Sequence, residues 1–167
     1  MSSDPGGPPG HPGDDEAVAR LLGRPPQGRY HVVRRMADGS PAVIENEPFL
    51  ADGTPMPTRY WLVDPPLRDA VSRLEAAGGV RLAAAEVDPV ALAEAHRRYA
   101  AGRDAAIPAS HRGPVPSGGV GGTRAGVKCL HAHLAFWLAG GADPVGEWAA
   151  ERLGPELAGL AGRREVL

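Results

Sequence analysis

The residue types best suited to chemistry gather in one stretch of the chain, residues 116–133. This stretch contains the only cysteine, Cys129, the only lysine, Lys128, and two of the six histidines, His131 and His133. Four glycines precede them: Gly118, Gly119, Gly121 and Gly122. A glycine-rich loop that runs into a helix with these side chains is typical of an anion site, a nucleophile site or half of a metal site.

The loop itself predicts an anion-binding site. Successive backbone N–H groups of a glycine-rich turn can surround an anion at a helix N-terminus, and Arg124 would bind its oxygens in pairs. The segment lacks the Gly-Lys-Ser/Thr of a P-loop, and no strand precedes it as in a dinucleotide fingerprint. A flexible connector is the alternative interpretation. The candidate ligand-binding residues are Gly118, Gly119, Gly121, Gly122, Thr123, Arg124 and Lys128, joined by Glu45 and Arg59 from another loop.

We predict a helix over residues 126–139, capped by Thr123, and its geometry decides which side chains can cooperate. At about 100° per residue, Cys129 and His133 lie one turn apart on one side, and His131 lies about 160° away from Cys129. One hypothesis is that Cys129 is a nucleophile and His133 its base. If the helix begins at Thr123, however, Cys129 lies past the first turn.

A second hypothesis makes Cys129 and His133 metal ligands, with zinc as the possible ion. Two ligands are too few, so further ones would come from elsewhere, such as Glu45, Glu47 or His31. In the third interpretation Cys129 is a small buried apolar residue, as free cysteines often are.

The surrounding sequence predicts an α+β fold with a small antiparallel sheet (a β-hairpin plus a third strand) covered by about four helices. Strands are expected over residues 30–36, 42–44 and 59–63, with a turn at Asp38-Gly39. Helices are expected over 16–22 and after three Asp-Pro pairs that begin at Asp64, Asp88 and Asp143, in addition to the helix over 126–139.

The long loop over residues 45–58 is a second candidate region. Glu45 and Glu47 close one strand and Arg59 opens the next, so these groups could supply acid, base or ligand atoms facing the glycine loop. Solvated charges at the ends of strands are the alternative interpretation.

Length and composition bound the rest. The 167 residues predict a single domain over 16–153, with a disordered tail over 1–15 and a weakly structured tail over 154–167. A net charge of −2 gives no electrostatic footprint for nucleic acid or an anionic membrane surface, and no apolar run is long enough to cross a bilayer. The first residues lack the features of a signal peptide, so we expect a cytoplasmic protein.

Three segments, residues 44–50, 57–62 and 117–133, resemble the bacterial domain of unknown function 501 family, which is largely actinobacterial. The resemblance covers about residues 20–153, and its hallmarks are Gly-Gly-Val-Gly-Gly-Thr-Arg and Lys-Cys-Leu-His-Ala-His. No activity is assigned to the family, so it supplies no catalytic residue. Its genes tend to lie near those for a septum formation initiator, enolase and an exopolyphosphatase, which implies a role in division or phosphate metabolism.

A leading function and two alternatives follow. The first is a small enzyme or binding protein for an anionic, phosphorylated small molecule. The first alternative is a non-enzymatic module that binds a division-related protein through Trp61, Trp148 or Phe49. The other alternative is a protein with a purely structural zinc ion. The sequence makes no prediction of the oligomeric state.

Overall fold

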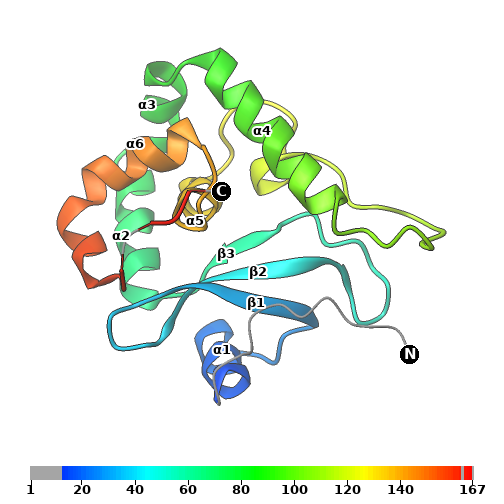
Figure 1. Cartoon of the computed structure of the whole chain (residues 1–167). Coiled ribbons are helices and arrows are strands. Elements are labelled where there is room, and N and C mark those ends of the chain that lie inside the picture. Colours follow the sequence, from blue (N-terminus) through cyan, green and yellow to red (C-terminus); the bar gives the residue numbers. More distant parts are fainter. Residues whose placement is uncertain (1–12, 163, 167) are drawn as a thin grey trace.

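A three-stranded antiparallel sheet divides the fold into two unequal parts (Figure 1). The computed structural model describes residues 13–162 and 164–166. The strands β1 (Gly28–Arg35), β2 (Pro41–Leu50) and β3 (Tyr60–Leu62) lie in that order across the sheet. Helix α1 (Asp14–Leu22) covers one face. The opposite face carries α2 (Pro65–Ala76), α3 (Gly79–Glu86), α4 (Pro89–Asp104), α5 (Leu130–Leu138) and α6 (Pro144–Leu153), with the short 3₁₀ turns η1 (Val120–Gly122) and η2 (Gly154–Gly159).

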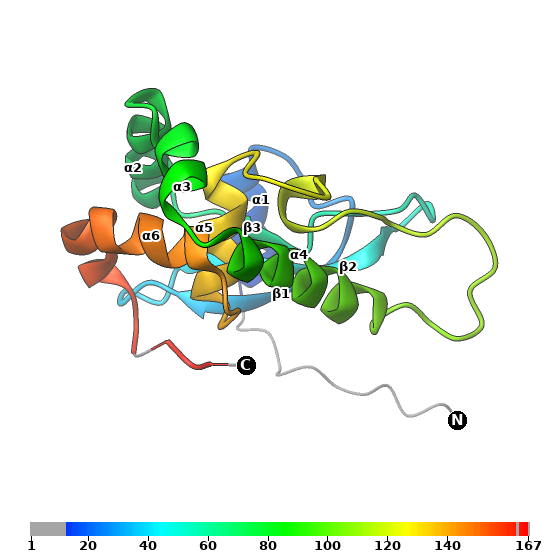
Figure 2. The same ribbon diagram turned by 90° about the horizontal axis from the view of Figure 1, so that it is seen from above.

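This layering confirms the predicted α+β fold and explains the burial of β2. Successive side chains of a strand point to opposite faces, so Val43 joins the large core under the helices while Ile44 packs with Val18 of α1. Helix α5 lies in the middle of the helical layer, against α6, β3 and α2 (Figures 1 and 2). It is therefore the element that connects the sheet to the other helices.

The three Asp-Pro pairs begin helices as predicted. The carboxylates of Asp64, Asp88 and Asp143 accept hydrogen bonds from amides of the first turns of α2, α4 and α6, at 2.9 to 3.2 Å. Proline at the first helical position has no N–H to satisfy, and its φ already suits a helix. These three starts depend only on local chemistry.

The start of α5 was predicted wrongly. The helix begins at Leu130, and Cys129 is its N-cap in an extended conformation, with φ −150° and ψ 144°. The Thr123 hydroxyl donates to the carbonyl oxygen of Ala125 instead of capping a helix. Gly126 adopts a positive φ of 69°, which interrupts helical geometry before the helix can start.

Other boundaries differ as well. Strand β2 continues to Leu50, so residues 45–50, expected in a loop, pair with β1. Helix α2 ends at Ala76, just before the pair Gly78-Gly79 that the sequence offers as its stop signal, but Gly79 then opens the short helix α3, which the sequence did not predict. Within the described residues, no helix is both long and apolar enough to span a bilayer.

The residues after α6 contact the core. Leu157 and Leu160 pack against it, and Leu160 forms a β-bridge with Met36. Arg164 donates to the carbonyl oxygens of Trp137, in the last turn of α5, and of Gly141, just beyond that helix. Residues 1–12 of the expected N-terminal tail lie outside the described part, and α1 already begins at Asp14. The predicted division into a domain and two tails stays a prediction.

Candidate functional site

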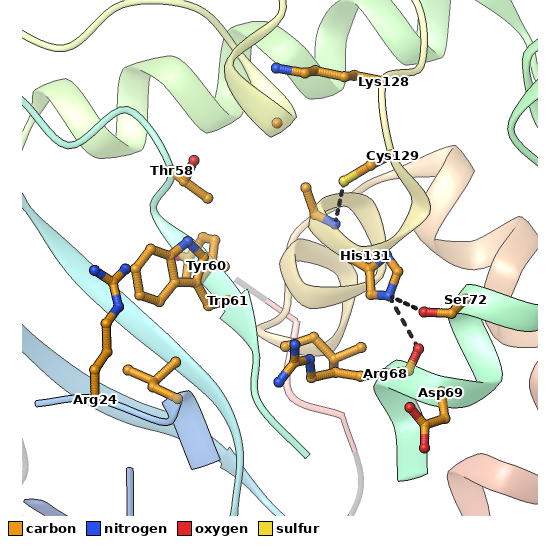
Figure 3. Close-up of a pocket in the computed structure, with 14 residues that line it drawn as sticks. Arg24, Thr58, Tyr60, Trp61, Arg68, Asp69, Ser72, Lys128, Cys129 and His131 are labelled. Atoms are coloured by element: carbon orange, nitrogen blue, oxygen red, sulfur yellow. Dashed lines mark hydrogen bonds between the residues drawn. The ribbon is translucent and has the colours of Figure 1, made fainter. Parts of the chain in front are cut away.

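A pocket of about 650 Å³ lies where the start of α5 faces α2 and β3. In Figure 3, Arg24 and Trp61 lie on one side, Cys129, His131 and Ser72 on the other, and the Arg68 side chain between them. The pocket therefore joins segments that are distant in the sequence: the end of α1, β3, α2, η1 and the N-terminus of α5.

Positive charge dominates this pocket. Arg24, Arg68 and Lys128 line it, with Asp69 as the one acidic lining residue. None of the three cations forms an ion pair with a residue of the described ranges, 13–162 and 164–166. Several other arginines do form such pairs, for example Arg35 with Asp14 at 2.7 Å. Unpaired cations around a concave surface favour an anionic ligand.

Cys129 lies at the edge of the pocket as the N-cap of α5. Its Sγ accepts a hydrogen bond from the amide of Ala132 at 3.4 Å, and the residue is half-buried. Amide groups of the first helical turn carry partial positive charge, so this end of α5 attracts anionic groups. The sequence-based argument that Cys129 lies past the first turn was wrong because the helix begins later.

His131 is held next to Cys129 by α2. Its Nδ1 lies 3.0 Å from Oε1 of Glu75, and its Nε2 lies 3.2 Å from the carbonyl oxygen of Arg68 and 3.3 Å from the hydroxyl of Ser72. The pKa of His131 is raised above its ordinary value, chiefly by the hydrogen bond with Cys129, with Glu75 and the Arg68 carbonyl adding to it and burial opposing it.

Donor atoms of Glu75, Cys129 and His131 all lie within 4.8 Å of one another. The sequence placed His131 on the far side of the helix from Cys129, and this is wrong, because Cys129 is not helical. The predicted pairing of Cys129 with His133 therefore gives way to a group in which His131 and Glu75 accompany the thiol.

His133 instead belongs to the core. It is 1% exposed, and its Nδ1–H donates to the buried carboxylate of Asp143 at 2.7 Å. Its Nε2 is buried without a hydrogen-bond partner among the described residues, and its ring meets the edge of His96, with centroids 5.7 Å apart. Asp143 also caps α6, so this pair fastens α5 to α6.

The glycine loop is a fixed part of the scaffold. The amide of Val120 donates to Nδ1 of His96, whose Nε2–H donates to the carbonyl oxygen of Gly126. The buried guanidinium of Arg103 donates to the carbonyl oxygens of Ser117 and Gly118. The loop could not approach α4 so closely with a larger residue at this position, since a Cβ on Gly119 would lie 2.4 Å from Nδ1 of His96.

These contacts leave little of the expected anion cradle. The amides of Gly119, Val120 and Gly122 already donate to groups of the protein. Gly121 and Lys128 do line the pocket, whereas Gly118, Gly119, Gly122, Thr123 and Arg124 are not among its lining residues. Their role as ligand-binding residues stays a prediction that this geometry does not favour.

Glu45 and Arg59 pair with each other away from Cys129. Their side chains meet at 2.5 Å and line a different cavity of about 650 Å³, between β1 and the end of α5. His31 pairs with Glu45 in the register of the sheet and is exposed. The cluster of candidate metal ligands contains none of the three residues that the sequence offered as partners for Cys129 (Glu45, Glu47 and His31).

Three polar residues of α2 belong to the site although the sequence did not predict them. Arg68, Ser72 and Glu75 follow one another at spacings of four and three, so they share one face of that helix. This polar face was the available signal, but a solvated helix face has the same pattern. Arg24, His96 and Arg103 act at long range and carry no local signal, and the local signal of Asp143 predicts only its role as a helix cap.

The aromatic residues proposed for protein binding have mixed exposure. Trp148 is buried, and its Nε1–H donates to Glu86 while Arg152 lies over its ring. Trp61 and Phe49 are half-buried, Phe49 stacking on His111 with centroids 4.2 Å apart. A partner-binding surface stays a prediction.

Comparison with known proteins identifies the family of the chain. The family described as "Protein of unknown function (DUF501)" matches residues 32–151, which include α5, α2 and most of the sheet. No curated protein and no solved structure matches the chain.

Proposed function

The chain belongs to this family of unknown function, and we propose that it binds a small phosphorylated molecule in the pocket between α2, β3 and the start of α5. The observation that carries the proposal is the set of three unpaired cations, Arg24, Arg68 and Lys128, around one concave site. The whole chain has a net charge of −2, so the positive pocket is a local feature.

The size and walls of the pocket support a small ligand. A volume of about 650 Å³ is in the range of small-molecule sites. The lining of the pocket also contains Trp61, Leu62 and Leu22, which would hold an apolar or planar part of the ligand. The cationic groups would bind its phosphate through charge-assisted hydrogen bonds.

Cys129 and His131 make an enzymatic role part of the same proposal. Both line the pocket at the N-terminus of α5, where a substrate bound by Arg68 and Lys128 would meet them. His133 is excluded from contact with a ligand in this arrangement because it is 1% exposed and paired with Asp143.

The test is binding of inorganic phosphate and of pyrophosphate, measured by isothermal titration calorimetry. The double variant Arg68→Gln/Lys128→Gln should bind pyrophosphate more weakly by at least about tenfold, since hydrogen bonds to charged groups contribute about 1.5–3 kcal/mol each. The matched control, Arg73→Gln/Arg81→Gln, removes two exposed arginines that do not line the pocket.

The control should bind like the unmodified protein. If both double variants bound pyrophosphate equally weakly, the loss of net positive charge would explain the result, and a specific site would be contradicted. Absence of saturable binding of either anion to the unmodified protein would also contradict it.

A further inference from the structure

The cluster of Glu75, Cys129 and His131 has the composition of a zinc site. A carboxylate oxygen, a thiol sulfur and an imidazole nitrogen lie within 4.8 Å of one another. Zinc accepts all three donor types, and sites with three protein ligands leave a fourth position for water or substrate. Two rigid elements supply the donors, because Glu75 lies in the last turn of α2 and the others begin α5.

The groups around the cluster orient these donors. Nε2 of His131 faces the carbonyl oxygen of Arg68 at 3.2 Å, so a proton on Nε2 leaves Nδ1 free to bind a metal on the side of Glu75 and Cys129. Metal-binding histidines usually donate their second N–H to such an acceptor. Oε1 of Glu75 accepts the amide of Leu130 at 2.7 Å, which fixes the carboxylate.

The charges also balance. An ionised Glu75 and a Cys129 thiolate together carry two negative charges, which equal the charge of one Zn²⁺ ion. A neutral metal centre then tolerates the nearby Arg68 and Lys128, which stay available for an anion. Cys129 and His131 line the pocket, so the open position of the metal would face it.

We propose that Glu75, Cys129 and His131 bind one zinc ion whose open coordination position accepts an oxygen of the anion in the pocket. The second half of this statement rests on the proposed function, and the first half does not. The sequence-based pairing of Cys129 with His133 is replaced by this set of ligands.

The test is titration of metal-free protein with Co²⁺, which substitutes for zinc and reports its ligands by absorption. Thiolate ligation gives a charge-transfer band in the near ultraviolet, and four-coordinate geometry gives intense visible bands. We expect one cobalt per chain and both signals. Because even residues that only orient ligands contribute about 10–100-fold to affinity, each of Cys129→Ser, His131→Asn and Glu75→Gln should weaken binding by more than about 100-fold.

The matched controls are His31→Asn and Glu47→Gln, which remove the same side-chain types outside the cluster and should bind cobalt unchanged. Circular dichroism and Tm measured without metal establish that each variant is folded. Cobalt binding without the charge-transfer band, or unchanged binding by Cys129→Ser, would overturn the zinc site.

A second titration separates the two proposals. Adding pyrophosphate to the cobalt protein should shift the visible bands, and Arg68→Gln/Lys128→Gln should bind cobalt normally but lose this shift. If pyrophosphate binds without shifting the bands, the anion site stands and its contact with the metal is wrong. If cobalt binds and pyrophosphate does not, the metal site stands and the proposed function is wrong.

Discussion

His131 and His133 lie two residues apart in the sequence, yet they belong to different regions of the molecule. His133 faces the junction of α5 with α6, where it is 1% exposed and bonded to a carboxylate that is itself buried. His131 lies at the open end of the same helix, half-exposed beside Cys129 and Glu75. A histidine that builds the core and one that is available for chemistry can therefore share a short motif.

The largest expected effect is a difference in stability between variants of these two histidines. His133→Ala removes one partner of a buried pair and leaves Oδ2 of Asp143 buried without its partner, so the free energy of unfolding should fall by about 3–5 kcal/mol. The matched variant His131→Ala should lower it by about 1 kcal/mol or less, because the ion pair of His131 is partly exposed. Urea unfolding of both variants checks the contrast, and equal losses would refute it.

The next effect concerns the buried side of the glycine loop. Arg103→Met removes the hydrogen bonds to the carbonyl oxygens of Ser117 and Gly118, with an expected loss of about 1.5–3 kcal/mol. Amide hydrogen exchange around Val120 should become faster. Arg124→Met, at an exposed position of the same segment, is the control and should change neither quantity.

The next prediction concerns the loss of stability at high pH, which depends on two buried tyrosines packed against α5. Burial raises the pKa of both Tyr60 and Tyr99 to about 12, and both rings pack against Phe136. Their contribution to stability is full below pH 10, the unfolded value, and is lost as the pH rises through about 12.

Ultraviolet titration tests this directly. The folded protein should show little tyrosinate at pH values where the urea-unfolded chain has ionised. If all tyrosines of the folded protein ionised near pH 10, Tyr60 and Tyr99 would be accessible to water and the prediction would be wrong.

The smallest expected effect is the change in stability caused by replacing Glu75, which lies beside His131 and Cys129. Glu75→Gln keeps an oxygen that accepts the amide of Leu130, so the metal-free protein should lose less than about 1 kcal/mol of stability. Glu75→Ala, which removes the acceptor, should lose more. If Glu75→Gln instead unfolded the chain, Glu75 would belong with His133 among the core residues, and the contrast between the two regions would fail.

Local rules explain which parts of the fold were predictable. The helices after Asp64, Asp88 and Asp143 were predicted because an N-cap carboxylate and a first-turn proline act within four residues. The hairpin followed from Asp38-Gly39 for the same reason. Helix α3 was missed because Gly78-Gly79 is a good stop signal as well as a possible start.

The site was harder to predict because it depends on one boundary and on contacts across the chain. Thr123 is a common capping residue and Cys129 is not, so the start of α5 was predicted too early. As a result His133, and not His131, was expected to lie beside Cys129. Glu75 lies 56 residues from His131 in the sequence. Nothing near Cys129 in the sequence indicates that α2 brings a carboxylate to it.

The segment after α6 has a consequence for solubility. Strand β1 is an edge strand, and edges with free N–H and C=O groups can pair with other molecules. At the end of β1, the amide of Ala161 donates to the carbonyl oxygen of Arg35, and the amide of Ala37 donates to that of Gly159. Residues 159–161 thus cover the part of the edge next to the hairpin turn. Removing them would expose a template for intermolecular β-pairing, so shortened versions of this chain should aggregate more readily at high concentration.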